Sequence, residues 1–351
     1  MIQKNANAVI QAIIAAILFG ASPPLVKLLL GEIEPIMLAG FLYLGSGIGL
    51  IMYRSFKRIM GHESIEAGIR REDVPWLAGS ILAGGIAAPI VLMFSLRNTP
   101  AATASLLLNF EGVATTLIAF LVFKEAIGRR VGFAVSFITL ACIILSWNAG
   151  GEWGFSLGAL GVLLACVLWG MDNNLTRNIS AKDPLAIVTI KGLAAGTFSL
   201  TLALFTNNSF PNLKIILGAI VLGCFSYGLS IVFFILAMRN LGAARTSAFF
   251  GTAPFVGAVL SFIFLNEHPA LQFYLSFPIM ALGAYLLLKE EHDHEHLHEV
   301  VEHEHRHCHN DGHHTHYHPG QSNVEHSHWH VHEAIRHTHP HTPDLQHRHE
   351  H

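Results

Sequence analysis

The sequence is short of charge and of paired cysteines. Asp, Glu, Lys and Arg make up 13% of its 351 residues, whereas soluble domains carry about 25%. The four cysteines stand singly and form no C-x-x-C pair, which argues against a zinc ribbon or a disulfide framework. The apolar runs hold neither H-E-x-x-H nor G-x-S-x-G, so we expect no enzymatic activity and no required cofactor.

The sequence is instead rich in long apolar runs. A membrane helix needs about 20 mostly apolar residues, and ten stretches qualify. Their limits are 9–30, 35–53, 74–95, 101–123, 130–147, 155–176, 185–206, 213–238, 243–265 and 270–288. A soluble protein with very apolar helices is the alternative, but so many runs with so few charges favour the membrane. The sequence therefore predicts an all-α membrane protein of ten transmembrane helices.

Basic residues between these stretches indicate the orientation. If the N-terminus is cytoplasmic, the inner segments hold 14 basic residues and the outer segments only Lys27, Arg97 and Lys214. Cytoplasmic loops of membrane proteins carry an excess of Lys and Arg. We therefore expect both termini on the cytoplasmic side.

An internal repeat divides the apolar part into residues 1–150 and 151–289. Each half would hold five helices, an odd number, so the two halves must lie in the membrane with opposite orientation. Such inverted repeats are typical of alternating-access transporters, whose substrate site lies near the midplane. The matches at an offset of 142 are Arg97-Asn98 with Arg239-Asn240, Ala101-Ala102 with Ala243-Ala244, and Glu125 with Glu267; earlier in each half, Phe19-Gly20 matches Trp169-Gly170 and Glu34-Pro35 matches Asp183-Pro184.

These features resemble the EamA-like family of the drug/metabolite transporter superfamily. The resemblance rests on the five-plus-five spans, on Phe-Gly or Trp-Gly in the first helix of each half, and on Arg-Asn-x-x-x-Ala-Ala before a helix that ends in Glu. It covers roughly residues 9–288 and departs from the family pattern at Gly112, where the second half has Pro254. The resemblance implies a carrier of small metabolites in the inner (plasma) membrane, and it does not identify the substrate.

Charged residues within the apolar stretches are the first candidates for function, because a charge in the bilayer costs at least about 2.5 kcal/mol. Glu111 lies near the middle of the fourth stretch and is the candidate for proton or cation coupling; the alternative is a structural glutamate. Lys191, in the seventh stretch, would pair with Asp172 or Glu111 or bind an anionic group. Tyr227, in the eighth, is a candidate for the transport pathway.

Polar and helix-breaking residues occupy equivalent places in the first helices of the two halves. Pro23 and Pro24 should kink or break the first helix, because proline removes backbone donors and frees carbonyls toward a cavity. Asp172, Asn173 and Asn174 stand at the equivalent place in the sixth stretch and offer oxygen atoms to a polar solute or a hard cation. The alternative is that they simply face water or headgroups.

The segment 290–351 differs from the rest of the chain. It carries 22 of the 24 histidines, and its 12 acidic residues and 3 arginines give a net charge of −9. Its polar composition predicts a disordered cytoplasmic tail, and alternating imidazoles favour binding of Zn, Ni or Co ions. A pH-responsive tether is the alternative. The proposed metal ligands are His292, His294, His296, His298, His303, His305, His307, His309, His313, His314, His316, His318, His326, His328, His330 and His332.

Together these patterns predict a secondary transporter that moves a small polar metabolite by alternating access. The alternatives are a carrier of a transition-metal ion or its chelate and, less in keeping with the repeat, a membrane-anchored metal buffer or sensor. The expected partners are the lipid bilayer, a small-molecule substrate, transition-metal ions and a second copy in a homodimer, with no nucleic acid.

Overall fold

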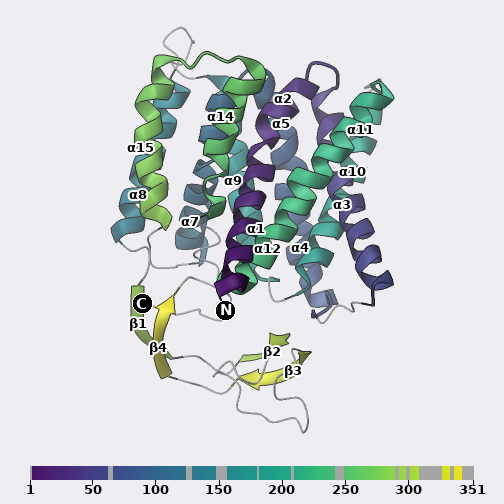
Figure 1. The fold of residues 1–351 in the computed structure, drawn as a ribbon, viewed down its shortest axis with the longest axis vertical. Coiled ribbons are helices and arrows are strands. Elements are labelled where there is room, and N and C mark those ends of the chain that lie inside the picture. The colour runs from purple at the N-terminus through teal and green to yellow at the C-terminus, as the bar shows by residue number, and fades with distance from the viewer. Residues whose placement is uncertain are drawn as a thin grey trace.

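The computed structural model describes residues 2–61, 66–123, 129–147, 156–179, 182–206, 209–241, 249–288, 292–297, 301–307, 326–332 and 336–341. Helices run back and forth along one direction and form a single bundle (Figure 1). In chain order they are α1 (Ile2–Gly20), α2 (Ser22–Leu29), α3 (Pro35–Ile59), η1 (Arg71–Asp73), α4 (Val74–Ser80), η2 (Ile81–Ala87), α5 (Ala88–Arg97), α6 (Ala101–Leu107), α7 (Phe110–Phe123), α8 (Arg129–Ser146), α9 (Leu157–Arg177), α10 (Pro184–Phe205), α11 (Leu213–Leu222), η3 (Gly223–Leu229), α12 (Ser230–Leu241), α14 (Ala253–Leu265) and α15 (Leu271–Leu288).

Eight helical segments of the described chain are long and apolar enough to cross a membrane. They are Asn7–Leu29, Pro35–Ile59, Arg71–Arg97, Ala101–Val122, Arg129–Ser146, Leu157–Arg177, Pro184–Phe205 and Leu213–Phe234. The last two predicted stretches contain the shorter apolar helices Ala253–Leu265 and Leu271–Leu286. A helical, multi-pass membrane protein is therefore confirmed, and the count of ten spans stays a prediction.

Helices of the N-terminal half pack mainly against helices of the C-terminal half. Extensive contacts join α3 with α10, α8 with α15, α1 with α12, α6 with α14, and α9 with both α5 and α7. Small residues allow this approach: a Cβ on Gly192 of α10 would lie 2.8 Å from the backbone nitrogen of Gly47 in α3. Small residues at contacts are typical of helix pairs in lipid, where backbones approach closely.

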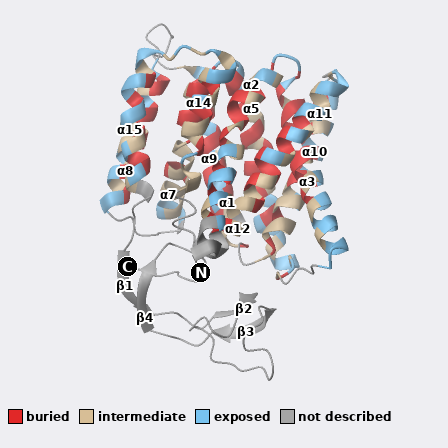
Figure 2. Ribbon diagram, in the orientation of Figure 1, coloured by how far each residue is buried: buried red, intermediate tan, exposed pale blue. Residues whose placement is uncertain are grey.

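The surface and the interior of the bundle differ as expected for a chain in lipid. Figure 2 shows buried residues along the inward faces of the helices and exposed residues along the outer ones. Large apolar side chains lie on the outside, and Leu121, Ile263 and Leu275 are 71%, 62% and 53% exposed. In water such a surface would aggregate, whereas in a bilayer it contacts acyl chains.

Two seven-residue π-helices interrupt the bundle at matching places. The helix η2 starts at Ile81 and η3 starts at Gly223, an offset of 142, which is the offset of the sequence matches. Each packs against the opposite half: η2 against α9 and α10, and η3 against α1 and α3. π-Helices often occur at functional sites because they leave carbonyls free of regular helical partners.

Four short strands follow the last helix: β1 (His292–Leu297), β2 (Val301–His307), β3 (His326–His332) and β4 (Arg336–His341). They form two antiparallel two-stranded sheets, β1 with β4 and β2 with β3. These strands take up part of the tail, and the expectation of disorder for residues 290–351 as a whole stays a prediction. The alternation of histidine with other residues has a period of two, which is the period of a strand.

Candidate functional site

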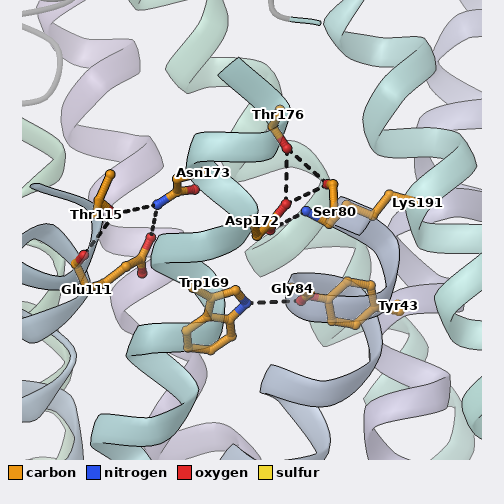
Figure 3. Close-up of polar contacts among 10 residues, drawn as sticks. All are labelled: Tyr43, Ser80, Gly84, Glu111, Thr115, Trp169, Asp172, Asn173, Thr176 and Lys191. Carbon is orange, nitrogen blue, oxygen red and sulfur yellow. Dashed lines mark hydrogen bonds and ion pairs between the residues drawn. The ribbon is translucent and has the colours of Figure 1, made fainter. Parts of the chain in front are cut away.

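Helix α9 carries a buried carboxylate at the contact between the halves. Asp172 is 5% exposed and forms an ion pair with the ammonium group of Lys191 on α10. Its Oδ1 accepts hydrogen bonds from the hydroxyls of Ser80, at 2.5 Å, and Thr176, at 3.0 Å (Figure 3). The sequence left Asp172 and Glu111 as possible partners of Lys191, and in the structure the partner is Asp172.

Asn173, the next residue of α9, contacts a second carboxylate, that of Glu111. The amide nitrogen of Asn173 donates to Oε1 of Glu111, at 2.9 Å, and to the hydroxyl oxygen of Thr115, at 3.1 Å (Figure 3). Glu111 lies in the first turn of α7, just after the helical path breaks between Leu107 and Phe110. One turn of α9 thus connects the two acidic residues that the sequence singled out.

The π-helix η2 forms one wall of this site. The carbonyl of Gly84 accepts hydrogen bonds from the hydroxyl of Tyr43, at 2.8 Å, and from the indole nitrogen of Trp169, at 3.1 Å. A Cβ at Gly84 would lie 1.9 Å from Oδ2 of Asp172, so this close approach requires glycine. The free carbonyl of a π-helix therefore orders two aromatic side chains beside the ion pair.

A second polar contact lies at the matching place in the other half. The hydroxyl of Ser22 donates to the hydroxyl oxygen of Tyr227 in η3, at 2.9 Å. The helical path breaks at Ala21, and Pro23 and Pro24 lie buried in the first turn of α2, as expected for prolines that interrupt a helix. The Tyr227 ring lies 5.6 Å from that of Tyr43, between centroids, which joins this contact to the wall formed by η2.

The sequence candidates fall into four groups. Glu111, Asp172, Asn173 and Lys191 come together around α9. Asn174 instead donates to the backbone carbonyls of Thr115 and Gly170, which indicates a structural role. Tyr227, Pro23 and Pro24 lie in the second contact. The tail histidines proposed as ligands lie either in the four strands, where the structure describes the backbone, or outside the described residues (His298, His309, His313, His314, His316 and His318).

Sequence reasoning missed several residues of the site. Ser80, Thr176 and Tyr43 carry no charge and stand singly in apolar runs, so their contribution depends on the packing of the helices. The adjacent pair Gly84-Gly85 was an available signal, because glycine within a helix is unfavourable by about 1 kcal/mol unless something approaches closely.

The end of the bundle opposite the N-terminus is held by contacts between loops and helix ends. Both carboxylate oxygens of Glu267 accept backbone N–H groups, those of Ala101 at 2.7 Å and Ala102 at 2.9 Å. The guanidinium group of Arg97 lies 3.0 Å from the carboxylate of Glu34. Glu267 follows α14 and Ala101 begins α6, so the first of these contacts ties the two halves together.

In the part of the chain whose side chains the structure describes, no group of three or more His, Cys, Asp or Glu side chains is placed to hold an ion. The charged groups of the site are thus an ion pair and an amide-bound carboxylate.

A helical membrane bundle with charged and amide side chains gathered between its spans has the form of a membrane transporter. The sequence profile of the EamA-like transporter family matches residues 6–147 and 156–289. The chain belongs to this family, which confirms the resemblance given above.

Known proteins similar to this chain include two transporters. One is an "Uncharacterized transporter" of Methanothermobacter thermautotrophicus, 28% identical over 294 residues, which cover 79% of this chain and 85% of that protein. The other is a "Probable terminal-alkyne amino-acid exporter" of Streptantibioticus cattleyicolor, 28% identical over 210 residues, which cover 58% and 70%. A solved crystal structure shares the fold with a TM-score of 0.59 at 19% identity, covering 80% of this chain and 94% of that one.

Proposed function

We propose that the chain is a secondary transporter of the inner (plasma) membrane that moves a small polar metabolite by alternating access and couples this movement to protons at Glu111. The observation that carries the proposal is the pairing of Asn173 with Glu111 one residue from the buried Asp172–Lys191 ion pair. Charged groups in the interior of a membrane protein are rare and mark ion or substrate pathways.

The side-chain amide of Asn173 binds either the carboxylate of Glu111 or the solute, and this choice couples the solute to the proton on Glu111. Asn173 is exposed, whereas Asp172 and Asn174 on either side are buried, so a solute can reach its amide group. Hydrogen bonds to a charged group contribute about 1.5–3 kcal/mol, against about 0.5–1.5 kcal/mol for neutral partners. Protonation of Glu111 therefore weakens its hold on Asn173 by roughly 1 kcal/mol and frees the amide for a solute.

The repeat supports alternating access. In a protein of ten spans in two inverted halves, rocking of one half against the other would open the central site to one face of the membrane and close it to the other. The matching π-helices η2 and η3 and the two matches of the family profile support this arrangement. With the N-terminus cytoplasmic, the contact of Glu267 with the start of α6 lies on the outer side, so the described conformation would be closed to the outside.

The site also bears on the substrate class. An amino acid carries an ammonium group and a carboxylate group. The carboxylate of Asp172 is complementary to the first and the ammonium group of Lys191 to the second, and the amide of Asn173 lies beside them. The name of the Streptantibioticus relative points in the same direction. We therefore propose an amino acid or a similar zwitterion as the transported solute, with a transition-metal ion or its chelate as the alternative to be tested.

The test is transport by the purified full chain in liposomes. Radiolabelled amino acids, zinc and nickel should be offered singly, with and without an imposed pH gradient. We expect accumulation of at least one amino acid that depends on the gradient, and none of the metals. Uptake of metal alone would replace the proposed substrate class, and no gradient-dependent uptake of any zwitterion or metal would contradict the proposal of a coupled carrier.

A further inference from the structure

The first sheet of the tail brings histidines of two distant segments into register. In the β1–β4 pair, His292 stands opposite His341, His294 opposite His339, and His296 opposite His337. Successive residues of a strand belong to alternate faces, so these six positions share one face of the sheet. The other face takes the positions between them, which include Asp293 and Glu295.

The second sheet repeats the arrangement. In the β2–β3 pair, His303 stands opposite His330, His305 opposite His328, and His307 opposite His326. If the register of either sheet shifted by one residue, each histidine of one strand would stand opposite a residue other than histidine. The histidines of the two strands would then lie on opposite faces of the sheet. Both strand pairs therefore adopt a register in which histidine stands opposite histidine at three positions, each two residues from the next.

This placement suits a transition-metal ion. Directly opposite positions in an antiparallel pair have Cβ atoms about 4.5–5.5 Å apart, and same-face neighbours along a strand follow at about 6.8 Å. Two successive pairs supply four imidazoles, the number of ligands that a tetrahedral zinc ion takes. The acidic residues of the tail, 12 against 3 arginines, add attraction for a cation.

We propose that each of the two sheets binds a transition-metal ion of the zinc class on its histidine face. The sites are built from pairs that join the start of the tail to its end, rather than from runs of neighbouring histidines. They lie after α15, at the end of the bundle where the chain begins (Figure 1), and metal binding there is independent of the solute that the helices carry.

The first test compares two triple variants of the purified full chain in detergent. His337→Gln, His339→Gln and His341→Gln remove the β4 side of one histidine face. His347→Gln, His349→Gln and His351→Gln, the control, remove three tail histidines that are not among the proposed ligands. Zinc binding is measured at pH 7.5 by competition with a chromophoric chelator. We expect the β4 triple to lose about half of the tightly bound zinc and the control triple to lose none; equal losses, or no loss from the β4 triple, would overturn the proposal.

The second test examines the register itself with a double-mutant cycle. His294→Gln and His339→Gln affect the same site, so the double variant should lose little more tightly bound zinc than either single one. His294→Gln and His328→Gln affect different sheets, and their losses should add. Additive losses for both combinations would show that the opposite positions do not share an ion. Tight binding should also fall as the pH drops below about 6.5, because imidazole must be neutral to bind metal; binding unchanged at pH 5 would exclude histidine ligands.

Discussion

Replacement of Lys191 by methionine should destabilise the protein much more than loss of an exposed lysine. Asp172 is 5% exposed, and without the ammonium group its carboxylate keeps only the hydroxyls of Ser80 and Thr176. Removal of one partner of a buried ion pair costs about 3–5 kcal/mol. At about 2–4 °C per kcal/mol, we expect the melting temperature in detergent to fall by roughly 6–20 °C.

The same reasoning predicts a rescue. Asp172→Asn keeps the shape and the hydroxyl partners of the side chain, so the double variant with Lys191→Met leaves no unpaired charge and should regain most of the lost stability. It should still fail to transport, because the charged pair proposed to receive the zwitterion is gone. Lys214→Met, at an exposed position, is the control and should change the melting temperature by less than about 2 °C. A Lys191→Met variant as stable as wild type, or a double variant less stable than the single one, would refute the assignment of a buried pair.

Three further predictions concern the packing, the outer contact and the orientation. Gly84→Ala should lower stability by at least about 1–3 kcal/mol through overpacking, whereas Gly132→Ala, with nothing within 4 Å of the added Cβ, should not; equal melting temperatures would contradict the close approach. Glu267→Ala removes two charge-assisted hydrogen bonds of about 1.5–3 kcal/mol each and should lower the melting temperature and slow transport, unlike Glu32→Ala at an exposed position. A reporter enzyme fused after Lys289 should read cytoplasmic, and an external reading would reverse the orientation.

Apolar runs and repeated short motifs sufficed to predict the helical membrane fold and the family. Both depend on local composition, since any segment that crosses lipid must be apolar and must satisfy its own backbone. The offset of 142 in the sequence reappears in the positions of η2 and η3, although apolar composition is the same in α- and π-helices and could not reveal the π-helices themselves.

The site was predictable only in part. The charges of Glu111, Asp172 and Lys191 stand out against apolar neighbours, and the structure brings all three to α9 and the helices beside it. Which of them pair depends on how α9 is rotated against α7 and α10, and no local pattern encodes that rotation. For the tail, composition predicted disorder, whereas the period-two alternation was the signal for the strands that the structure shows.

The most direct test of the central claim is the movement of protons when solute is added. Liposomes that contain the full chain and a trapped pH indicator receive the transported amino acid without an imposed gradient. The wild-type protein should change the internal pH, and Glu111→Gln should abolish that change, because an amide accepts the hydrogen bond from Asn173 and cannot carry a proton. The variant should still exchange labelled for unlabelled solute, and Glu72→Gln, at an exposed position, should behave as wild type. A solute-driven pH change of equal size in wild type and Glu111→Gln would contradict the account.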